Sequence, residues 1–359
     1  MRHLLTAFTL AVAATASAEN LQPGAPSAPA APAAPAAAPP EVPTPPPAPA
    51  SAAADAATPP VEVSTPSSAA AAPPPAVSPA PAPTPAPANP YALPFQLRPI
   101  VQPTLVRIET AAAWHGVDST KYAGFNDVGI LTVGYAATKS TGFGLRVPFV
   151  YNAPDGPGAP ASILQFANPA VVVTHTPFPT EPIRVGFSGA VSIPVGNGKG
   201  MAGSAAAKAA NTTGMLTRLA MDNLLFLPND LSFASGVSCA YVAGGLTIQA
   251  DVTMLNTFKV RKAPGDNART NGLMGVGAGY FLTPSVSVGA ELLYQHWLTT
   301  PAAVAVDDLL RSNLSGLVGA RYHHKTDWGW ARPGLALAQG LSGYTDRTTE
   351  VRFDLPMIF

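Results

Sequence analysis

The sequence has a single cysteine, few charged residues and no long apolar run. One cysteine, Cys239, excludes an intramolecular disulfide framework, and its position excludes a lipid anchor on a cysteine near the start of the chain. We expect Cys239 to be a small apolar filler on a strand face. Charged residues make up 11% of the chain and the formal net charge is zero, so no nucleic-acid partner is expected. Without about eighteen uninterrupted apolar residues, no transmembrane helix is expected either.

Lysine and arginine are absent from residues 19–97, where the only acids are Glu19, Glu41, Asp55 and Glu62. Residues 23–90 hold more than half of the 42 prolines, together with much alanine and almost no large apolar side chains. Such a composition cannot bury enough apolar surface to offset the entropy of ordering the chain. It predicts a disordered Pro/Ala-rich spacer over residues 19–90, with partial polyproline-II character.

The first residues have the pattern of an export signal. Arg2 precedes an apolar run over residues 4–14, and residues 16–18 (Ala-Ser-Ala) suit cleavage before Glu19. The run is too short to cross a bilayer as a helix. The sequence therefore predicts a signal peptide over residues 1–18, a periplasmic segment over 19–90 and a folded domain over 91–359.

From about residue 100 the sequence alternates in short runs separated by Gly, Pro, Asn and Asp, which is typical of strands. In "FGLRVPFVY", Phe143, Leu145 and Val147 share one strand face, whereas Gly144 and Arg146 share the other. The pattern predicts twelve strands, over residues 100–114, 123–137, 142–152, 163–176, 183–196, 231–242, 245–259, 272–282, 285–298, 312–323, 329–340 and 348–359. Short turns alternate with long loops between them, which is typical of bacterial outer-membrane barrels.

The less apolar strand face consists of Gly, Ala and Ser with isolated charges, as at Ser232, Gly236 and Gly277. A water-facing sheet would carry many Lys, Glu and Thr there, so this face fits the crowded interior of a narrow barrel better. Aromatic residues near strand ends on the apolar face fit membrane-interface girdles: Tyr151, Tyr241, Tyr280, Tyr294, Tyr322 and Phe359. The predicted fold is all-β, a transmembrane up-and-down antiparallel β-barrel in the outer membrane.

Strand alternation also places isolated charges on the inward face. The candidate lumen-lining residues are Arg146, Arg184, Asp251, Glu291, Arg321, Arg352 and Asp354. They could line a pore or a constriction. Alternatively, opposite signs pair with one another because a barrel interior cannot leave charges unsatisfied, and we favour this second interpretation. The mixed signs argue against strong ion selectivity.

Catalytic and metal sites find little support in the sequence. His175 could approach Ser188 or Ser192 on the following strand, but no Asp or Asn is placed to orient the imidazole. The neighbouring His323 and His324 point to opposite faces if they lie on a strand, which disfavours a metal site. We therefore expect no enzymatic activity, no metal and no cofactor.

The longest loop contains "MLTRLAMDNLLFLPND", residues 215–230. Helical spacing, which predicts a short amphipathic helix, is followed by Leu216, Leu219, Ala220, Asn223, Leu224 and Leu227. Such a helix could fold inward as a lid or constriction, or it could cap the external rim. The segment could also be a broken extra strand, and the sequence favours none of these arrangements.

The chain ends on "VRFDLPMIF", in which Phe353, Leu355, Met357 and Phe359 are apolar at every second place. With the export signal and the alternating strands, this ending resembles the terminal strand of Gram-negative outer-membrane β-barrels. The resemblance implies that these four residues form an assembly signal, and that the barrel assembly machinery and outer-membrane lipid are partners.

Three segments, "LPFQLRP", "VSIPVG" and "FLTPSVSVGAELLYQ", resemble those of twelve-stranded outer-membrane uptake channels for aromatic compounds. This resemblance implies a passive channel or uptake protein for small, including hydrophobic, solutes. The Pro/Ala-rich extension departs from these channels. It resembles barrels that carry a periplasmic peptidoglycan-binding domain, although no such folded domain is present, so contact with peptidoglycan through the linker is an open alternative. A structural barrel that anchors a periplasmic Pro/Ala-rich arm, without transport, is the second functional hypothesis.

Overall fold

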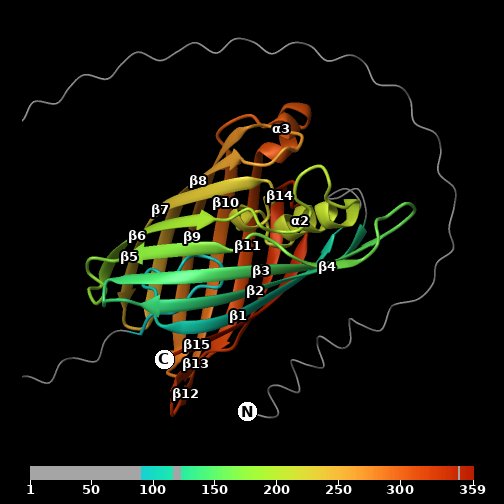
Figure 1. Ribbon diagram of the computed structural model, residues 1–359. Helices are drawn as coiled ribbons and strands as arrows, with labels where there is room; N and C mark the ends of the chain where they lie inside the picture. The colour runs from blue at the N-terminus through green and yellow to red at the C-terminus, as the bar shows by residue number, and fades with distance from the viewer. Residues whose placement is uncertain (1–89, 116–122, 347) are drawn as a thin grey trace, which may run out of the picture. The chain divides into compact units, whose positions relative to one another are not determined.

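The computed structural model describes residues 90–115, 123–346 and 348–359. The predicted signal peptide and all but the last residue of the predicted spacer lie outside these residues. Twelve antiparallel strands form a closed barrel, in which β1 pairs with both β2 and β15 (Figure 1). The wall strands are β1 (Leu105–His115), β2 (Ala123–Ala136), β3 (Thr141–Asp155), β5 (Ala170–His175), β6 (Ile183–Ser192), β7 (Asp230–Ala243), β8 (Leu246–Lys259), β9 (Ala268–Thr283), β10 (Val286–Trp297), β11 (Ser312–Tyr322), β14 (Gly334–Gly343) and β15 (Thr349–Ile358).

Within the described ranges, three short strands and four short helical elements accompany the wall. Strand β4 (Ile163–Phe166) precedes β5 in the chain and pairs with β3. Strands β12 (His324–Thr326) and β13 (Gly329–Ala331) form a hairpin that follows β11. The helical elements are α2 (Ala205–Thr217), η1 (Asn223–Leu225), α3 (Ala302–Val306) and η2 (Asp308–Arg311). No helix in the described ranges is long and apolar enough to span a membrane.

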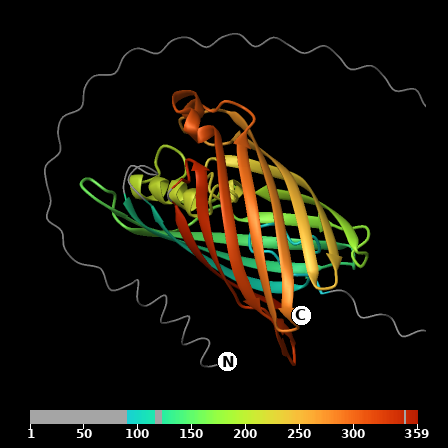
Figure 2. The same ribbon diagram turned by 180° about the vertical axis from the view of Figure 1, so that it is seen from behind.

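Burial alternates along the wall strands as predicted. On β8, Gln249 and Asp251 are buried, whereas Ile248 and Val252 are exposed by 50% and 55%. Large apolar side chains are exposed in the same way on strand after strand. These strands run all the way around the barrel (Figures 1 and 2). Water-soluble monomers seldom expose so much contiguous apolar surface, whereas the hydrocarbon core of a bilayer requires it. The predicted all-β transmembrane barrel of twelve strands is confirmed.

Some strand boundaries differ from the prediction for identifiable reasons. The first strand begins at Leu105, because the chain before it folds into the barrel, where the carbonyl of the buried Ile100 accepts from Thr176 Oγ1. The predicted strand 163–176 is interrupted at residues 167–169, where the backbone N–H of Asn168 donates to Leu225 O (2.8 Å). The predicted strand 329–340 is split at residues 332–333, where Pro333 has no N–H to continue the ladder.

The predicted helix over residues 215–230 is wrong for most of its length. Helix α2 starts earlier, where Ser204 Oγ caps the N–H of Ala207 (3.1 Å), and it ends at Thr217. Beyond it, Leu219 and Ala220 adopt the left-handed backbone conformation (φ 51° and 61°). Helical spacing therefore misled the sequence analysis, because these buried apolar residues line a compact turn rather than one helix face.

The end of β15 is held between two neighbours. Ile358 is in register with Leu105 of β1 and with Trp330 of β13, and the N–H of Phe359 donates to Thr104 O (3.0 Å). The Phe359 ring lies 5.4 Å from that of Trp328, centroid to centroid. The four residues of the implied assembly signal lie on the outward face of this strand; their part in assembly stays a prediction.

We expect Phe359→Asp to reduce the amount of assembled barrel severalfold while leaving synthesis unchanged. The substitution removes the terminal aromatic ring and places a charge at the lipid boundary. The folded fraction is measured by heat-dependent gel mobility of outer-membrane fractions, against total protein. Val306→Asp, which adds the same charge on a loop helix where the side chain is 90% exposed, is the control. Equal loss in both variants would refute a specific role for Phe359.

Candidate functional site: the lumen and its two inserted segments

The lumen contains the stretch of chain that precedes the first strand. We call residues 91–104 the strap. It enters the barrel at the end where the short turns and the C-terminus lie (Figure 1). Glu291 on β10 holds it, because one buried carboxylate accepts hydrogen bonds from the backbone N–H groups of Phe95 (2.6 Å), Gln96 (3.0 Å) and Leu97 (2.8 Å). Hydrogen bonds to an ionised acceptor are the strong kind.

Strand β8 holds the strap a second time. Three successive inward residues of β8, each two positions from the next, contact the strap. Thr247 Oγ1 accepts from Ala92 N (3.0 Å), Gln249 Nε2 donates to Arg98 O (2.6 Å), and Asp251 accepts from Arg98 N (3.1 Å). Backbone groups of the strap thus form hydrogen bonds with inward side chains of β8. The strap supplies hydrogen-bond partners for Thr247, Gln249 and Asp251.

The strap packs closely against glycines of the wall. A Cβ atom at Gly279 would stand 2.7 Å from Ala92 Cβ, and one at Gly277 would stand 2.8 Å from a methyl group of Leu97. At Gly319 a Cβ would meet the Phe95 ring at 2.7 Å. Several inward glycines of the kind that predicted a crowded interior therefore make room for the strap.

A second segment fills the lumen from the end with the long loops. We call residues 218–227, which follow α2, the inner loop. The guanidinium group of Arg218 is 1% exposed and lies 3.2 Å from Glu109 Oε1 on β1. Asn313 Nδ2 donates to Leu219 O (2.9 Å), and Gln96 Nε2 of the strap donates to Arg218 O (3.0 Å). The two inserted segments therefore meet inside the barrel, and the inward-folded alternative for this loop is the one observed.

Asp222 fixes the inner loop to the opposite wall. Its carboxylate accepts from Arg146 Nη1 (2.8 Å) and lies 2.9 Å from Arg218 Nη2. Burial raises the pKa of Asp222, but the guanidinium groups of Arg146 and Arg218 outweigh that effect and hold the pKa well below its usual range. The carboxylate is therefore ionised throughout the physiological pH range.

A buried ion-pair network lies beside the strap on the closing strands. Asp354 accepts from Arg107 Nε (2.7 Å) and lies 2.6 Å from Arg321 Nη2. Arg352 pairs with Glu350 at 2.6 Å. The four residues of this network that lie on β15 and β11 are each at most 2% exposed: Glu350, Arg352, Asp354 and Arg321. The Arg321 guanidinium also stacks over the Phe95 ring of the strap, 4.4 Å from its centroid.

All seven predicted lumen residues lie on the inward face. Six are buried, and Arg146 is partly exposed. Arg184 is held by Glu181 O (3.0 Å) and lies over the Tyr91 ring, so it too contacts the strap. Four of the seven take part in ion pairs, as the pairing interpretation anticipates: Arg146, Arg321, Arg352 and Asp354. Glu291 and Asp251 instead hold the strap backbone through their carboxylates.

Six charged residues, in the strap, in the inner loop and at the wall positions that contact these segments, were not predicted from the sequence. Arg107, Glu109 and Glu350 obey the same strand alternation as the predicted residues, so the pattern could have revealed them. The other three, Arg98, Arg218 and Asp222, lie in the strap and the inner loop. No periodicity places a residue of an irregular segment, and only the folded structure brings these three to the wall.

The histidines do not form the arrangements considered from the sequence. His175 is exposed, with Nδ1 2.9 Å from Thr141 Oγ1, whereas Ser188 faces inward toward Arg98. His323 faces Ser287 (2.8 Å) and His324 stacks outward on Tyr322. In the described part of the chain no three His, Cys, Asp or Glu residues are grouped as a metal site. Cys239 is exposed, on the outward face of β7.

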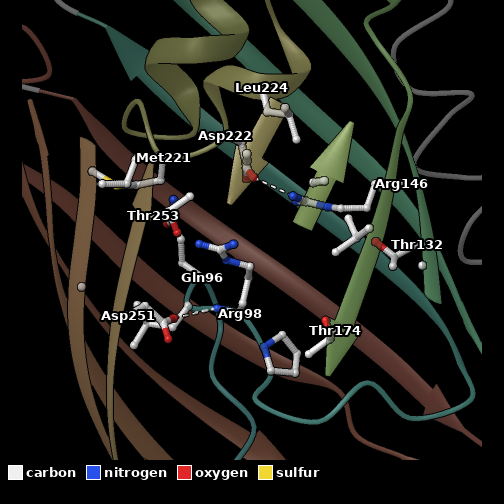
Figure 3. A pocket seen from close by; sticks show the side chains of 18 of the residues that line it. Gln96, Arg98, Thr132, Arg146, Thr174, Met221, Asp222, Leu224, Asp251 and Thr253 are labelled. Atoms are coloured by element: carbon white, nitrogen blue, oxygen red, sulfur yellow. Dashed lines mark hydrogen bonds and ion pairs between the residues drawn. The ribbon is translucent and has the colours of Figure 1, made fainter. Parts of the chain in front are cut away.

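A cavity of about 150 Å³ separates the strap from the inner loop (Figure 3). Arg98 lines the cavity on the side of the strap, and Met221, Asp222 and Leu224 of the inner loop line the opposite side. Inward side chains of the wall, including Thr253, complete it. This cavity is the space that the two inserted segments leave between them.

No protein family model matches the chain, and no curated protein matches it. Among solved structures, the COG4313 outer membrane channel from Pseudomonas putida F1 aligns with a TM-score of 0.51 and 12% identity, over 75% of this chain and 100% of that one. A KdgM porin in complex with disordered oligogalacturonate aligns with 0.42 and 10% identity over 71% and 99% of the two chains, and a NanC porin with 0.40 and 8% over 71% and 98%. At such identities the likeness concerns the fold alone. The chain has the closed twelve-stranded barrel fold of bacterial outer-membrane channels.

Proposed function

We propose that the chain is a passive outer-membrane channel for the uptake of small solutes, and that the structure is its closed state. One observation carries the proposal: two inserted segments, rather than side chains of the wall, fill the lumen. Hydrogen bonds hold the strap, and ion pairs and hydrogen bonds hold the inner loop. These contacts can be broken and remade without unfolding the barrel. When the segments move, the glycine-rich inward face leaves a lumen wide enough for solutes.

In this proposal the strap enters from the periplasm, where the preceding Pro/Ala-rich segment lies. The mixed signs of the lumen charges, most of them paired, favour weak ion selectivity. The protein carries out no chemical step on its solute. The alternative, a barrel that only anchors the Pro/Ala-rich arm, gives no reason for a filling made of two separable segments with a cavity between them.

We expect full-length protein in a planar bilayer to show a mostly closed baseline with brief openings. The closed periods follow from the filled lumen, and the openings from movement of a strap held without covalent links. Single-channel recording of the refolded barrel measures this, with heat-denatured protein as the control. If neither the wild type nor a variant with a weakened strap conducts, the channel proposal fails and the anchor is the better account.

A further inference from the structure

The cavity between the strap and the inner loop has the size and lining of a binding site for a small ring. Its apolar lining includes Leu224 of the inner loop and the inward leucines Leu255 and Leu273 of the wall. Apolar cavities of roughly 150 Å³ admit a benzene ring. The volume of about 150 Å³ found here therefore suits one ring-sized apolar body and excludes chains or sugars of several units.

The charges around the cavity leave one arginine without a counter-ion. Four arginines and three acids line it, so one positive charge is in surplus: Arg98, Arg107, Arg146 and Arg218 against Glu109, Asp222 and Asp251. Arg107, Arg146 and Arg218 each have a carboxylate oxygen within 3.5 Å. Arg98 has none within 4.0 Å among the residues that the structure describes.

The guanidinium group of Arg98 has donors to spare. Its Nη1 donates to Ser188 Oγ (2.6 Å), and within the described ranges its other nitrogens have no hydrogen-bond partner. The side chain extends from the strap toward the inner loop (Figure 3). Asp251 and Asp222 attract the guanidinium group of Arg98 without an ion-pair contact within 4.0 Å. The Asp251 carboxylate instead accepts from the Arg98 backbone N–H and from Gln249 Nε2 (3.1 Å). A planar guanidinium with free N–H groups is suited to bind a carboxylate through two hydrogen bonds.

We infer that this cavity is a binding site for a small organic monoanion, a carboxylate attached to a ring-sized apolar body, with the carboxylate on Arg98. This inference rests on the proposed function, because it names the class of solute that the channel takes up. A neutral ring would leave the surplus charge of Arg98 unpaired, and a cationic ring would add a second positive charge beside it. The site therefore selects by charge as well as by size.

Three isosteric probes test the inference: benzoate, benzamide and benzamidinium, which carry one negative charge, none and one positive charge. Full-length folded protein in detergent is titrated with each probe by calorimetry. We expect benzoate to bind at least tenfold more tightly than benzamide, since its carboxylate carries the opposite charge to Arg98 and accepts two parallel hydrogen bonds, whereas the amide offers a single acceptor oxygen. Benzamidinium should not bind. Equal affinity for all three probes would overturn the inference.

Variants locate the site. Arg98→Gln should lower benzoate affinity at least tenfold and lower benzamide affinity far less, whereas Arg98→Lys should retain part of the difference because it keeps the charge. Ala234→Leu, which fills the cavity from the wall, should abolish binding of both. Arg311→Gln, on the exposed rim, is the matched control and should change nothing. Heat-dependent gel mobility verifies that each variant is folded, and unchanged benzoate binding in folded Arg98→Gln or folded Ala234→Leu would overturn the assignment.

The binding result and the channel result can be told apart. Binding of benzoate through Arg98 in a protein that never conducts would refute the proposed channel but support the site. Conductance in a protein that shows no preference for benzoate would support the channel and overturn the site.

Discussion

Glu291→Ala is expected to raise the open probability of the barrel by a factor of roughly one hundred. The carboxylate accepts three backbone hydrogen bonds from the strap, and a hydrogen bond to a charged group contributes about 1.5–3 kcal/mol. Even when water replaces part of this, a loss of about 3 kcal/mol corresponds to a hundredfold shift in the closing equilibrium. The barrel wall keeps all its strand pairing, so the variant should remain folded.

Single-channel recording measures the effect, and Glu291→Gln is the graded companion because its side-chain oxygen can still accept some of the three bonds. Glu181→Ala is the matched control: that carboxylate is exposed in the turn before β6, and its backbone contact with Arg184 survives the substitution. If folded Glu291→Ala gates like the wild type, the strap is not what closes the lumen.

Asp354→Ala is expected to destabilise the folded barrel by about 3–5 kcal/mol, the range for breaking a buried ion pair. Asp354 is 0% exposed and lies between the guanidinium groups of Arg107 (2.7 Å) and Arg321 (2.6 Å). Its removal leaves two buried cations close together without an anion. The defect lies on β15, which closes the barrel against β1 and β14, so unfolding should begin more easily there.

Urea unfolding in detergent, followed by tryptophan fluorescence, measures the loss of stability. Asp308→Ala is the matched control, because the Asp308–Arg311 pair has the same chemistry at the rim, where the Asp308 side chain is 82% exposed. Exposed pairs contribute about 0–1 kcal/mol. Equal unfolding midpoints for the two variants would show that the buried network contributes no more than a surface pair.

For the lumen charges, strand alternation predicts the direction of each side chain but not its partner. Because a barrel wall separates lipid from lumen, every second residue must suit hydrocarbon, and this requirement is written into the local sequence. The inward direction of Asp251, Glu291 and Asp354 follows from their neighbours alone. Which charge pairs with which does not, since Asp354 meets Arg107 across 247 residues of chain.

By itself, the sequence determined the closed twelve-stranded barrel, its lipid-facing and lumen-facing sides and the positions of most wall strands. The physical reason is that lipid imposes one local period on every strand. Only the tertiary structure decided what fills the lumen. The strap has no period of its own, and its position depends on bonds such as that from Phe95 N to Glu291, 196 residues away. The inner loop likewise follows from Arg218 and Asp222 meeting Glu109 and Arg146, because these contacts exist only once the wall has closed around them.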